Sequence, residues 1–309
     1  MTQAGLFDSL DEKKKELEQL RAQIEYHEGV YRAGSPEITD AAFDEIVDQY
    51  DALADELGVA AEERVNFTPG ADHTEGFAQI EHRVPMLSLE KLSPNRKDSK
   101  GELMPLLEQL TTWYERRQKD LGEDGIPLLV EPKIDGISIS LIYQDGKLRQ
   151  AITRGDGKKG DDITRQVSQA RAVPALLRGI GGTLEVRGEI YWPHDAFEAH
   201  NDRLRAAGEA PLVNPRNGCA GLMKRKEPEG LEEVGITAFL YQVPWFDGVV
   251  VPEAQSKILA WLADSGAPVY LDEIFLAEDA RQAFDYCEGY HGRREALPYD
   301  IDGMVIKID

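Results

Sequence analysis

The sequence predicts an α+β protein, in which an N-terminal helical hairpin module is followed by a domain of antiparallel sheets flanked by helices. Two observations predict this class. Apolar residues recur at helical spacing in the first 60 residues, whereas short alternating segments separated by turn sequences dominate the chain after residue 127. A third is length, because 309 residues with 41% hydrophobic content can form two domains with cores of their own.

The first segment is predicted to form two amphipathic helices. Leu17, Leu20, Ile24 and Tyr31 recur at helical spacing, and the apolar residues between 43 and 57 do so more clearly.

A helix-breaking sequence separates the two helices, and a linker follows the second one. Gly34-Ser35-Pro36 ends the first helix, and Thr39 or Asp40 can cap the second. The stretch from Phe67 to Ile80 is rich in Gly, Thr and acidic residues, which suits a linker. We therefore place a domain boundary near residue 76, with a helical module over 1–76 and the sheet-rich domain over 77–309.

The second domain alternates strand and helix patterns. Tyr143-Gln144-Asp145-Gly146-Lys147 is a hairpin turn sequence between two strands. We find neither a Rossmann pattern nor a Walker loop. Strands are predicted over 128–133, 137–141, 148–153, 182–192, 236–243 and 304–308, and helices over 102–119, 196–207 and 253–263.

The composition predicts a soluble, cytoplasmic protein without a membrane partner. The sequence has no apolar run of membrane-spanning length and no signal-peptide pattern at its start. Cys219 and Cys287 are the only cysteines, and with six scattered histidines they give no disulfide framework and no zinc-ligand spacing.

The net charge of −22 argues against a nucleic-acid partner, since phosphate backbones are bound through Lys and Arg. The charge is uneven, however: residues 1–76 hold 19 acidic against 6 basic residues, which leaves 38 against 29 for the remainder. Basic residues also cluster in Lys224-Arg225-Lys226 and Arg293-Arg294. Each cluster is more typical of a solvated surface, so charge alone does not predict DNA binding.

Lys133 is the most informative residue. It ends the apolar run Leu128-Leu129-Val130 within Glu131-Pro132-Lys133-Ile134-Asp135-Gly136, so we expect its ammonium at a sheet edge between two carboxylates. A lysine acts as a nucleophile only when deprotonated, which requires neighbouring cations or a metal to lower its pKa. By itself the string is short, and a salt-bridged hairpin is the simpler interpretation.

Several further motifs occur in a fixed order, and together with Glu131-Pro132-Lys133-Ile134-Asp135-Gly136 they carry a resemblance. In this order and spacing the set resembles the adenylation region of bacterial-type NAD-dependent DNA ligases, over nearly the whole chain. The motifs are Pro85-Met86-Leu87-Ser88-Leu89, Thr153-Arg154-Gly155-Asp156-Gly157, Gly160-Asp161-Asp162-Ile163-Thr164, Leu184-Glu185-Val186-Arg187-Gly188-Glu189, Asn214-Pro215-Arg216-Asn217 and Asp300-Ile301-Asp302-Gly303-Met304-Val305-Ile306-Lys307.

The resemblance implies covalent nucleotidyl transfer. Lys133 would attack the α-phosphate of NAD and expel nicotinamide mononucleotide, and the AMP held on the lysine would later pass to the 5′-phosphate of a nick in double-stranded DNA. Phosphoryl transfer needs cations and Mg²⁺ around the transferred group. Arg154 and Lys307 match the family's nucleotide-contacting cations.

The resemblance also implies the remaining nucleotide contacts. Glu131 would accept from the adenine amino group, Glu189 would bind the ribose hydroxyls and Tyr241 would stack on the base. Each has a simpler alternative, in which Glu189 pairs with Arg187 and Tyr241 belongs to the core.

Other positions follow the same pattern. The backbone at Ser88 and Leu89 would line the site. Asp135 and Asp302 would organise Lys133 and Mg²⁺, although both are also ordinary Asp-Gly turns. Arg216 would contact DNA phosphate.

The helical module is what makes NAD the expected donor, because in the family it binds the nicotinamide half. Tyr31, Asp40 and Asp44 match the family's residues, whereas Arg32 stands in place of a histidine and Phe43 in place of a tyrosine. Phe43 keeps a stacking face, and Arg32 adds a permanent charge that could hold phosphate.

Three functions stay open at this point. The first is the adenylation fragment of an NAD-dependent DNA ligase, acting as a monomer; the family's next lysine motif and its further domains would follow Lys307. The second is an ATP- or GTP-dependent nucleotidyltransferase of the RNA ligase or capping type, which shares the Lys-x-Asp-Gly string. The third is a non-catalytic nucleotide-binding relative.

Overall fold

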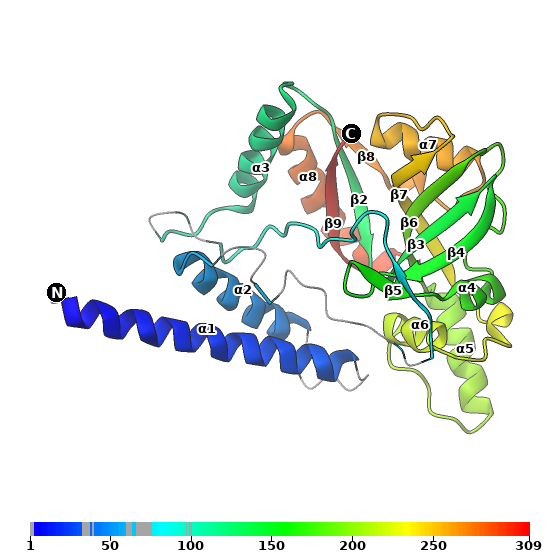
Figure 1. Ribbon diagram of the computed structural model, residues 1–309, viewed down its shortest axis with the longest axis horizontal. Coiled ribbons are helices and arrows are strands. Elements are labelled where there is room, and N and C mark those ends of the chain that lie inside the picture. Colours follow the sequence, from blue (N-terminus) through cyan, green and yellow to red (C-terminus); the bar gives the residue numbers. More distant parts are fainter. Residues whose placement is uncertain are drawn as a thin grey trace. The chain divides into compact units, whose positions relative to one another are not determined.

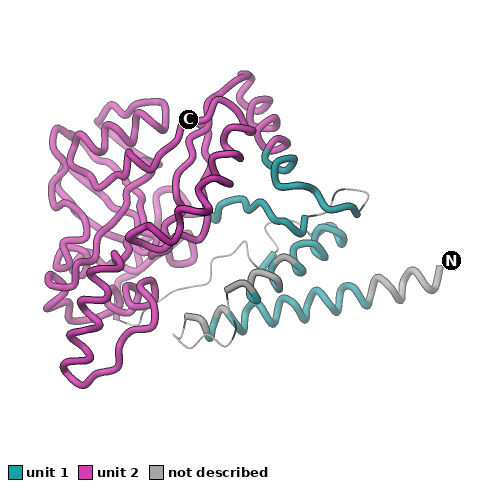
Figure 2. Tube along the Cα trace, turned by 180° about the vertical axis from the view of Figure 1, so that it is seen from behind, with its two compact units in different colours: residues 1–70, 87–110 teal, residues 71–86, 111–309 magenta. Residues whose placement is uncertain are grey.

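The computed structural model describes residues 3–32, 38, 40–59, 64–65, 74, 76–96, 98 and 101–309. The chain divides into two compact units, one of residues 1–70 and 87–110 and the other of residues 71–86 and 111–309 (Figure 2). The domain boundary near residue 76 stays a prediction.

The first unit contains the predicted helical hairpin. Helix α1 spans Gln3–Arg32 and α2 spans Asp40–Glu56, and the two run side by side (Figure 1). They pack through a small core of Leu17, Leu20, Ile24, Tyr50 and Ala54. The predicted helices are therefore confirmed.

The second unit contains the mixed α+β part of the chain, which confirms the predicted fold class. Its strands form antiparallel ladders only. The strands are β1 (Gln79–Glu81), β2 (Leu128–Ile134), β3 (Ile137–Gln144), β4 (Lys147–Thr153), β5 (Lys159–Asp161), β6 (Thr183–Tyr191), β7 (Thr237–Asp247), β8 (Phe275–Ala277) and β9 (Ile301–Ile308); the helices are α3 (Leu106–Leu121, which begins in the first unit), α4 (Thr164–Ala170), α5 (His194–Ala206), α6 (Pro215–Met223), α7 (Gln255–Asp264) and α8 (Ala280–Tyr290).

The strands form three sheets. A four-stranded sheet has the order β4-β3-β6-β7, a three-stranded sheet has the order β8-β2-β9, and β1 pairs with β5. The turn between β3 and β4 is as predicted, since Asp145 and Gly146 both have positive φ, as a two-residue hairpin requires. In Figure 1, β2 and β9 lie side by side with α8 next to them.

Two local predictions are wrong. Residues 128–133 and 137–141 do not form a hairpin, because β2 and β3 belong to different sheets and Asp135-Gly136 carries the chain between them. A Cβ on Gly136 would lie 2.2 Å from the Ile190 carbonyl oxygen, so this crossing requires glycine. The strand that carries Lys133 is also the central strand of its sheet and not an edge.

The four-stranded sheet has one apolar and one polar face. Residues such as Leu141, Val186 and Leu240 point into the large core, which helices α4 to α7 complete. Alternate residues on the same strands point the other way, and this second face is where buried polar groups gather. It carries Ser138, Ser140, Glu185, Arg187, Glu189 and Tyr241.

An aromatic cluster continues from this second face. Phe239, Tyr270 and Tyr299 stack successively with ring centroids 5.3 and 5.5 Å apart, and Tyr191 meets Tyr299 edge-on.

Both cysteines are free thiols. No helix within the described ranges has the length and apolar character needed to span a bilayer.

Candidate active site

The pairing of β2 with β9 brings three charged residues to one face of the small sheet. Lys133 pairs with Gly303, Glu131 with Val305 and Leu129 with Lys307. Residues opposite each other in an antiparallel pair share a face, and so do residues two apart on one strand. Glu131, Lys133 and Lys307 therefore project from the same face.

Glu131 and Lys307 form a buried ion pair at this face. The Glu131 side chain is only 3% exposed, and Lys307 Nζ contacts its Oε1. Burial raises the pKa of Glu131, and the Lys307 ammonium counteracts that shift. Among the residues that the structure describes, the second oxygen, Oε2, has no hydrogen-bond partner. A buried acceptor without a donor is costly, so this atom suits an incoming N–H group.

Lys307 also links the two larger sheets. Its Nζ donates to the Tyr241 carbonyl oxygen at 3.2 Å and lies 4.9 Å from the centroid of the Tyr241 ring. The ring is partly buried beside the aromatic cluster. Tyr241 thus packs against the core, as the alternative expected, and also contacts Lys307; its stacking on a base stays a prediction.

The carboxylates near Lys133 are paired differently from the expectation. Lys133 Nζ forms an ion pair with Asp302, not with its sequence neighbours. Asp135 forms an ion pair with Arg216 of α6, and its backbone N–H donates to the Asp300 carbonyl at 2.9 Å. The two Asp-Gly sequences therefore lie at the same end of the small sheet, and each supplies a carboxylate to a different cation.

Glu189 lies on the polar face of β6 and accepts from the Ser138 hydroxyl at 2.9 Å. Desolvation raises the pKa of Glu189 to about 7, with Ser138, Arg216 and Lys133 opposing the shift. The alternative pairing with Arg187 is wrong, because the Arg187 Nε donates to Glu185 at 2.9 Å.

Arg154 sits at the turn after β4. Its Nε donates to the Met86 carbonyl at 3.1 Å, and its own carbonyl accepts from Gly157 N–H at 3.0 Å. Ser88 and Leu89 follow Met86 in the chain but belong to the first unit, where both are exposed.

The structure places the predicted nicotinamide-side residues on α1 and α2. Tyr31 and Arg32 are the last residues of α1, and Asp40 and Asp44 lie in the first turns of α2. Their side chains lie outside the described parts of the chain. Phe43 is partly buried and packs against the helical core. The roles of these five residues stay predictions.

Sequence reasoning missed several residues of the polar face, namely Ser138, Ser140 and the pair of Glu185 with Arg187. A signal was present, because polar and apolar residues alternate in both strands and each polar residue faces away from the core. Which polar residues meet depends on the β3–β6 register, which places Ser138 opposite Glu189 and Ser140 opposite Arg187.

The residues of the site could hold Mg²⁺ only together with oxygens of a bound phosphate and water. No group of three or more His, Cys, Asp or Glu that could hold a metal occurs in the described residues. Asp135 and Asp302 offer hard carboxylate oxygens, and Mg²⁺ is commonly held by one or two carboxylates together with substrate phosphates and water. The donor set is consistent with that mode.

Comparisons with known proteins agree with this geometry. Residues 74–309 match the sequence model of the NAD-dependent DNA ligase adenylation domain. Proteins named DNA ligase from Methylococcus capsulatus and Hahella chejuensis are 35% and 37% identical, over 94% and 96% of this chain. The chain spans about 42% of the length of each.

Similarity to solved structures is weaker. A mycobacterial DNA ligase D complexed with ATP and MES aligns at a TM-score of 0.33 and 17% identity, covering 59% of this chain and 48% of the other. An archaeal ATP-dependent RNA ligase aligns at 0.35 and 18%, covering 59% and 39%. At these scores we base no argument on either.

Proposed function

Because the chain belongs to the family of NAD-dependent DNA ligase adenylation domains, we propose that Lys133 takes up AMP from NAD. In this reaction a bond forms between Lys133 Nζ and the α-phosphorus, and the phosphoanhydride bond to nicotinamide mononucleotide breaks. The leaving group departs as nicotinamide mononucleotide, and AMP remains on the lysine as a phosphoramidate.

Residues around Lys133 would orient the amine and stabilise the developing charge. The amine must lose a proton before it attacks, and that proton would pass to water, while Asp302, which is paired with Lys133, would orient the amine. The phosphoryl group carries negative charge spread over its oxygens, which Arg154 and Lys307 would stabilise. Asp135 and Asp302 would hold Mg²⁺, which when bound neutralises phosphate charge.

The adenosine half would bind between the two larger sheets. The unsatisfied Oε2 of Glu131 would accept from the adenine amino group, which is the single observation that carries this proposal. Tyr241 would stack on the base. The Glu189 carboxylate, held by Ser138, would accept from the ribose hydroxyls.

The steps after formation of lysyl-AMP are proposed because the relatives are named DNA ligase. We propose that the AMP passes from Lys133 to the 5′-phosphate of nicked double-stranded DNA, within DNA repair and replication in the cytoplasm. The chain would act as a monomer. Tyr31, Arg32, Asp40, Phe43 and Asp44 would bind the nicotinamide half, so NAD and not ATP would be the donor.

A labelling experiment tests the donor and the nucleophile. The protein is incubated with Mg²⁺ and NAD, ATP or GTP, each labelled in its α-phosphate, and the covalently labelled peptide is identified by mass spectrometry. We expect label from NAD only, on the peptide that contains Lys133.

Two variants sharpen this experiment. Lys133→Met should abolish labelling, whereas Lys147→Met, an exposed lysine on β4, should label like the wild type. Label from ATP or GTP alone, or label that survives in Lys133→Met, would contradict the proposal.

A further inference from the structure

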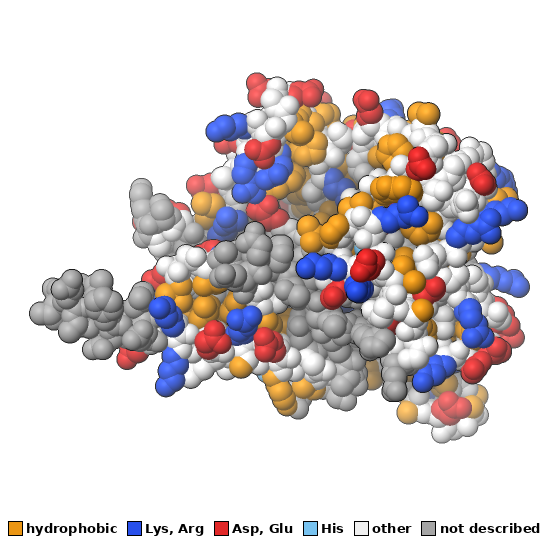
Figure 3. All heavy atoms as spheres, viewed as in Figure 1, with side chains coloured by type: hydrophobic (Ala, Val, Ile, Leu, Met, Phe, Trp, Pro, Cys, Tyr) orange, Lys and Arg blue, Asp and Glu red, His pale blue; other side chains and the backbone are white. Residues whose placement is uncertain are grey.

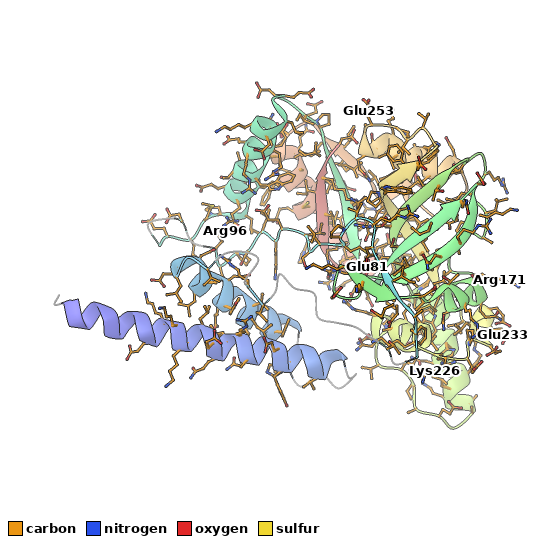
Figure 4. All side chains as sticks on the ribbon, viewed as in Figure 1. Glu81, Arg96, Arg171, Lys226, Glu233 and Glu253 are labelled. Carbon is orange, nitrogen blue, oxygen red and sulfur yellow. The ribbon has the colours of Figure 1, made fainter. Side chains whose placement is uncertain are left out.

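Residues 82–86, which we call the strap, belong to the second unit. They are held across the polar face of the four-stranded sheet. Strand β1, which ends at Glu81 (labelled in Figure 4), leads into the strap and pairs with β5. Glu81 and Lys159 form an ion pair across these strands at 3.2 Å. The strap is then fixed at both ends by backbone bonds. His82 N–H donates to the Lys158 carbonyl and Met86 N–H to the Gly157 carbonyl, each at 2.8 Å.

Two side-chain contacts hold the middle of the strap: Arg83 stacks on the Trp245 ring at 4.1 Å, and Arg187 binds the carbonyls that follow. The Arg187 Nη1 donates to the Pro85 carbonyl at 3.1 Å, and its Nη2 donates to the Val84 carbonyl. Proline has no N–H and cannot join a ladder, so backbone pairing alone cannot anchor this part of the strap. The planar guanidinium is suited to the task, since it donates in several directions at once.

Arg187 is in turn fixed by a buried carboxylate. Its Nε and Nη2 both lie 2.9 Å from Glu185 Oε1, and the two side chains are only 7% and 1% exposed. The Ser140 hydroxyl donates to the same oxygen at 2.9 Å. Three donor atoms converge on Glu185 Oε1, and this arrangement holds the guanidinium in one orientation, while Glu185 Oε2 has no hydrogen-bond partner among the described residues.

The strap connects Arg187 to the candidate active site. The Met86 carbonyl accepts from Arg154 Nε, so the strap orients the cation that we assign to the phosphates. Arg187 also lies two residues from Glu189 on the same face of β6. Burial raises the pKa of Tyr241, and the charges of Arg187 and Arg154 both oppose that shift.

We propose that Arg187 is a positioning residue for nucleotidyl transfer, which fixes the strap and through it the guanidinium of Arg154. The role rests on the proposed function, since it concerns the phosphate cation of that reaction. It differs from a role in binding the nucleotide, because Arg187 acts through Met86 and Arg154. Misplacing a positioning group typically costs rate more than affinity.

The test must separate positioning from a loss of folding. Replacing Arg187 alone leaves the Glu185 carboxylate buried without its partner, which is destabilising by itself. We therefore choose the double variant Glu185→Gln, Arg187→Met, which removes both charges at similar volume. Arg187→Lys keeps the charge but cannot bridge two carbonyls and a carboxylate, and Arg149→Met changes an exposed arginine on β4 as the control.

Three measurements on the full chain are compared: thermal unfolding, hydrogen exchange of residues 82–90, and labelling of Lys133 by NAD in a single turnover. In the double variant we expect faster exchange in the strap and a labelling rate at saturating NAD lower by on the order of 10²-fold. AMP affinity should be nearly unchanged, and Arg187→Lys should show an intermediate rate.

Two outcomes overturn the role. One is a labelling rate in the folded double variant equal to that of the wild type. The other, which applies if the double variant does not fold, is an Arg187→Lys variant that labels like Arg149→Met. Absence of labelling in the wild type itself would instead overturn the proposed function, and with it this role.

Discussion

The buried ion pair of Glu131 with Lys307 gives two residues proposed to bind nucleotide a structural role as well. Removing one member of a buried ion pair leaves an uncompensated charge, which typically costs ~3–5 kcal/mol. We therefore expect Lys307→Met to lower the free energy of unfolding by an amount of that order. Glu131→Gln combined with Lys307→Met should recover most of it, since no buried charge remains.

Chemical denaturation of the single and double variants, together with AMP titration calorimetry, checks this prediction. AMP affinity should be lost in all of them, because stability returns in the double variant but the binding groups do not. Equal stability of Lys307→Met and the wild type would contradict the buried-pair interpretation.

Glu189 makes stability depend on pH. Its folded-state pKa of about 7 lies above the ordinary value of 4.5, so the folded protein binds this proton more tightly than the unfolded chain does. The contribution to stability is fully present below about pH 4.5 and is lost as pH rises through 7. A shift of this size corresponds to about 3 kcal/mol.

Glu189→Gln removes that titration. We expect the variant to be more stable than the wild type at pH 8, with the difference shrinking towards pH 5, and to bind AMP more weakly. Urea unfolding of both proteins at several pH values measures the difference. Parallel pH profiles would mean that Glu189 keeps an ordinary pKa in the folded protein.

At the scale of elements, the sequence predicted the regular strands and helices but not which strands pair. Strands β2 and β9 carry the Lys133 face, yet 174 positions separate Glu131 from its partner Val305, so no local pattern reveals their register. For the same reason the local sequence alone did not exclude a salt-bridged hairpin at Asp135-Gly136, which in fact connects two sheets. The helices α1 and α2 were predictable because their packing partners are neighbours in the chain.

The missed elements have weak local signals. Strand β5 has three residues, and its Gly160 lies so close to Thr153 that a Cβ would be 1.7 Å from that carbonyl oxygen. Helix α6 contains Gly218 and Gly221, which disfavour helix; Asn214 caps it and Gly218 packs on the Trp192 ring. In each case tertiary contacts, and not propensity, decide the structure.

The predicted linker can be tested by truncation. A fragment of residues 71–309 keeps the Thr74 N–H that donates to Asp161 at 2.9 Å, whereas a 77–309 fragment loses it. We expect both fragments to bind AMP and neither to be labelled by NAD, with 71–309 the more stable in thermal unfolding. NAD labelling of either fragment at the wild-type rate would show that residues 1–70 do not select the donor.

At the scale of the whole molecule, net charge is a poor guide to the proposed DNA partner. The chain carries −22, but residues 1–76 account for −13 of it. On the face shown in Figure 3, basic and acidic side chains are interspersed. Contacts to DNA phosphate would therefore depend on local groups such as Arg216 and not on the field of the whole protein.

The two compact units allow a test of which half of NAD each of them binds. A ligand stabilises whatever it binds in the folded state, by about 2.7 kcal/mol at 100 times its Kd. Apart from Ser88 and Leu89, the residues proposed to bind AMP lie on strands and turns of residues 111–309, whereas those proposed for the nicotinamide half lie on α1 and α2. AMP should therefore slow hydrogen exchange in the β2, β6 and β9 amides and leave α1 and α2 unchanged, while NAD should slow exchange in both sets.

The measurement uses Lys133→Met, so that no covalent transfer occurs and both ligands can be compared at equal multiples of their Kd. Asp40→Asn serves as the matched variant, because it should abolish the effect of NAD on α1 and α2 and preserve the effect of AMP on the strands. If AMP alone protected α1 and α2 as much as NAD does, the helices would be responding to adenosine binding. The assignment of donor choice to Tyr31, Asp40 and Asp44 would then be wrong, because it requires the nicotinamide half, which AMP lacks, to be what protects these helices.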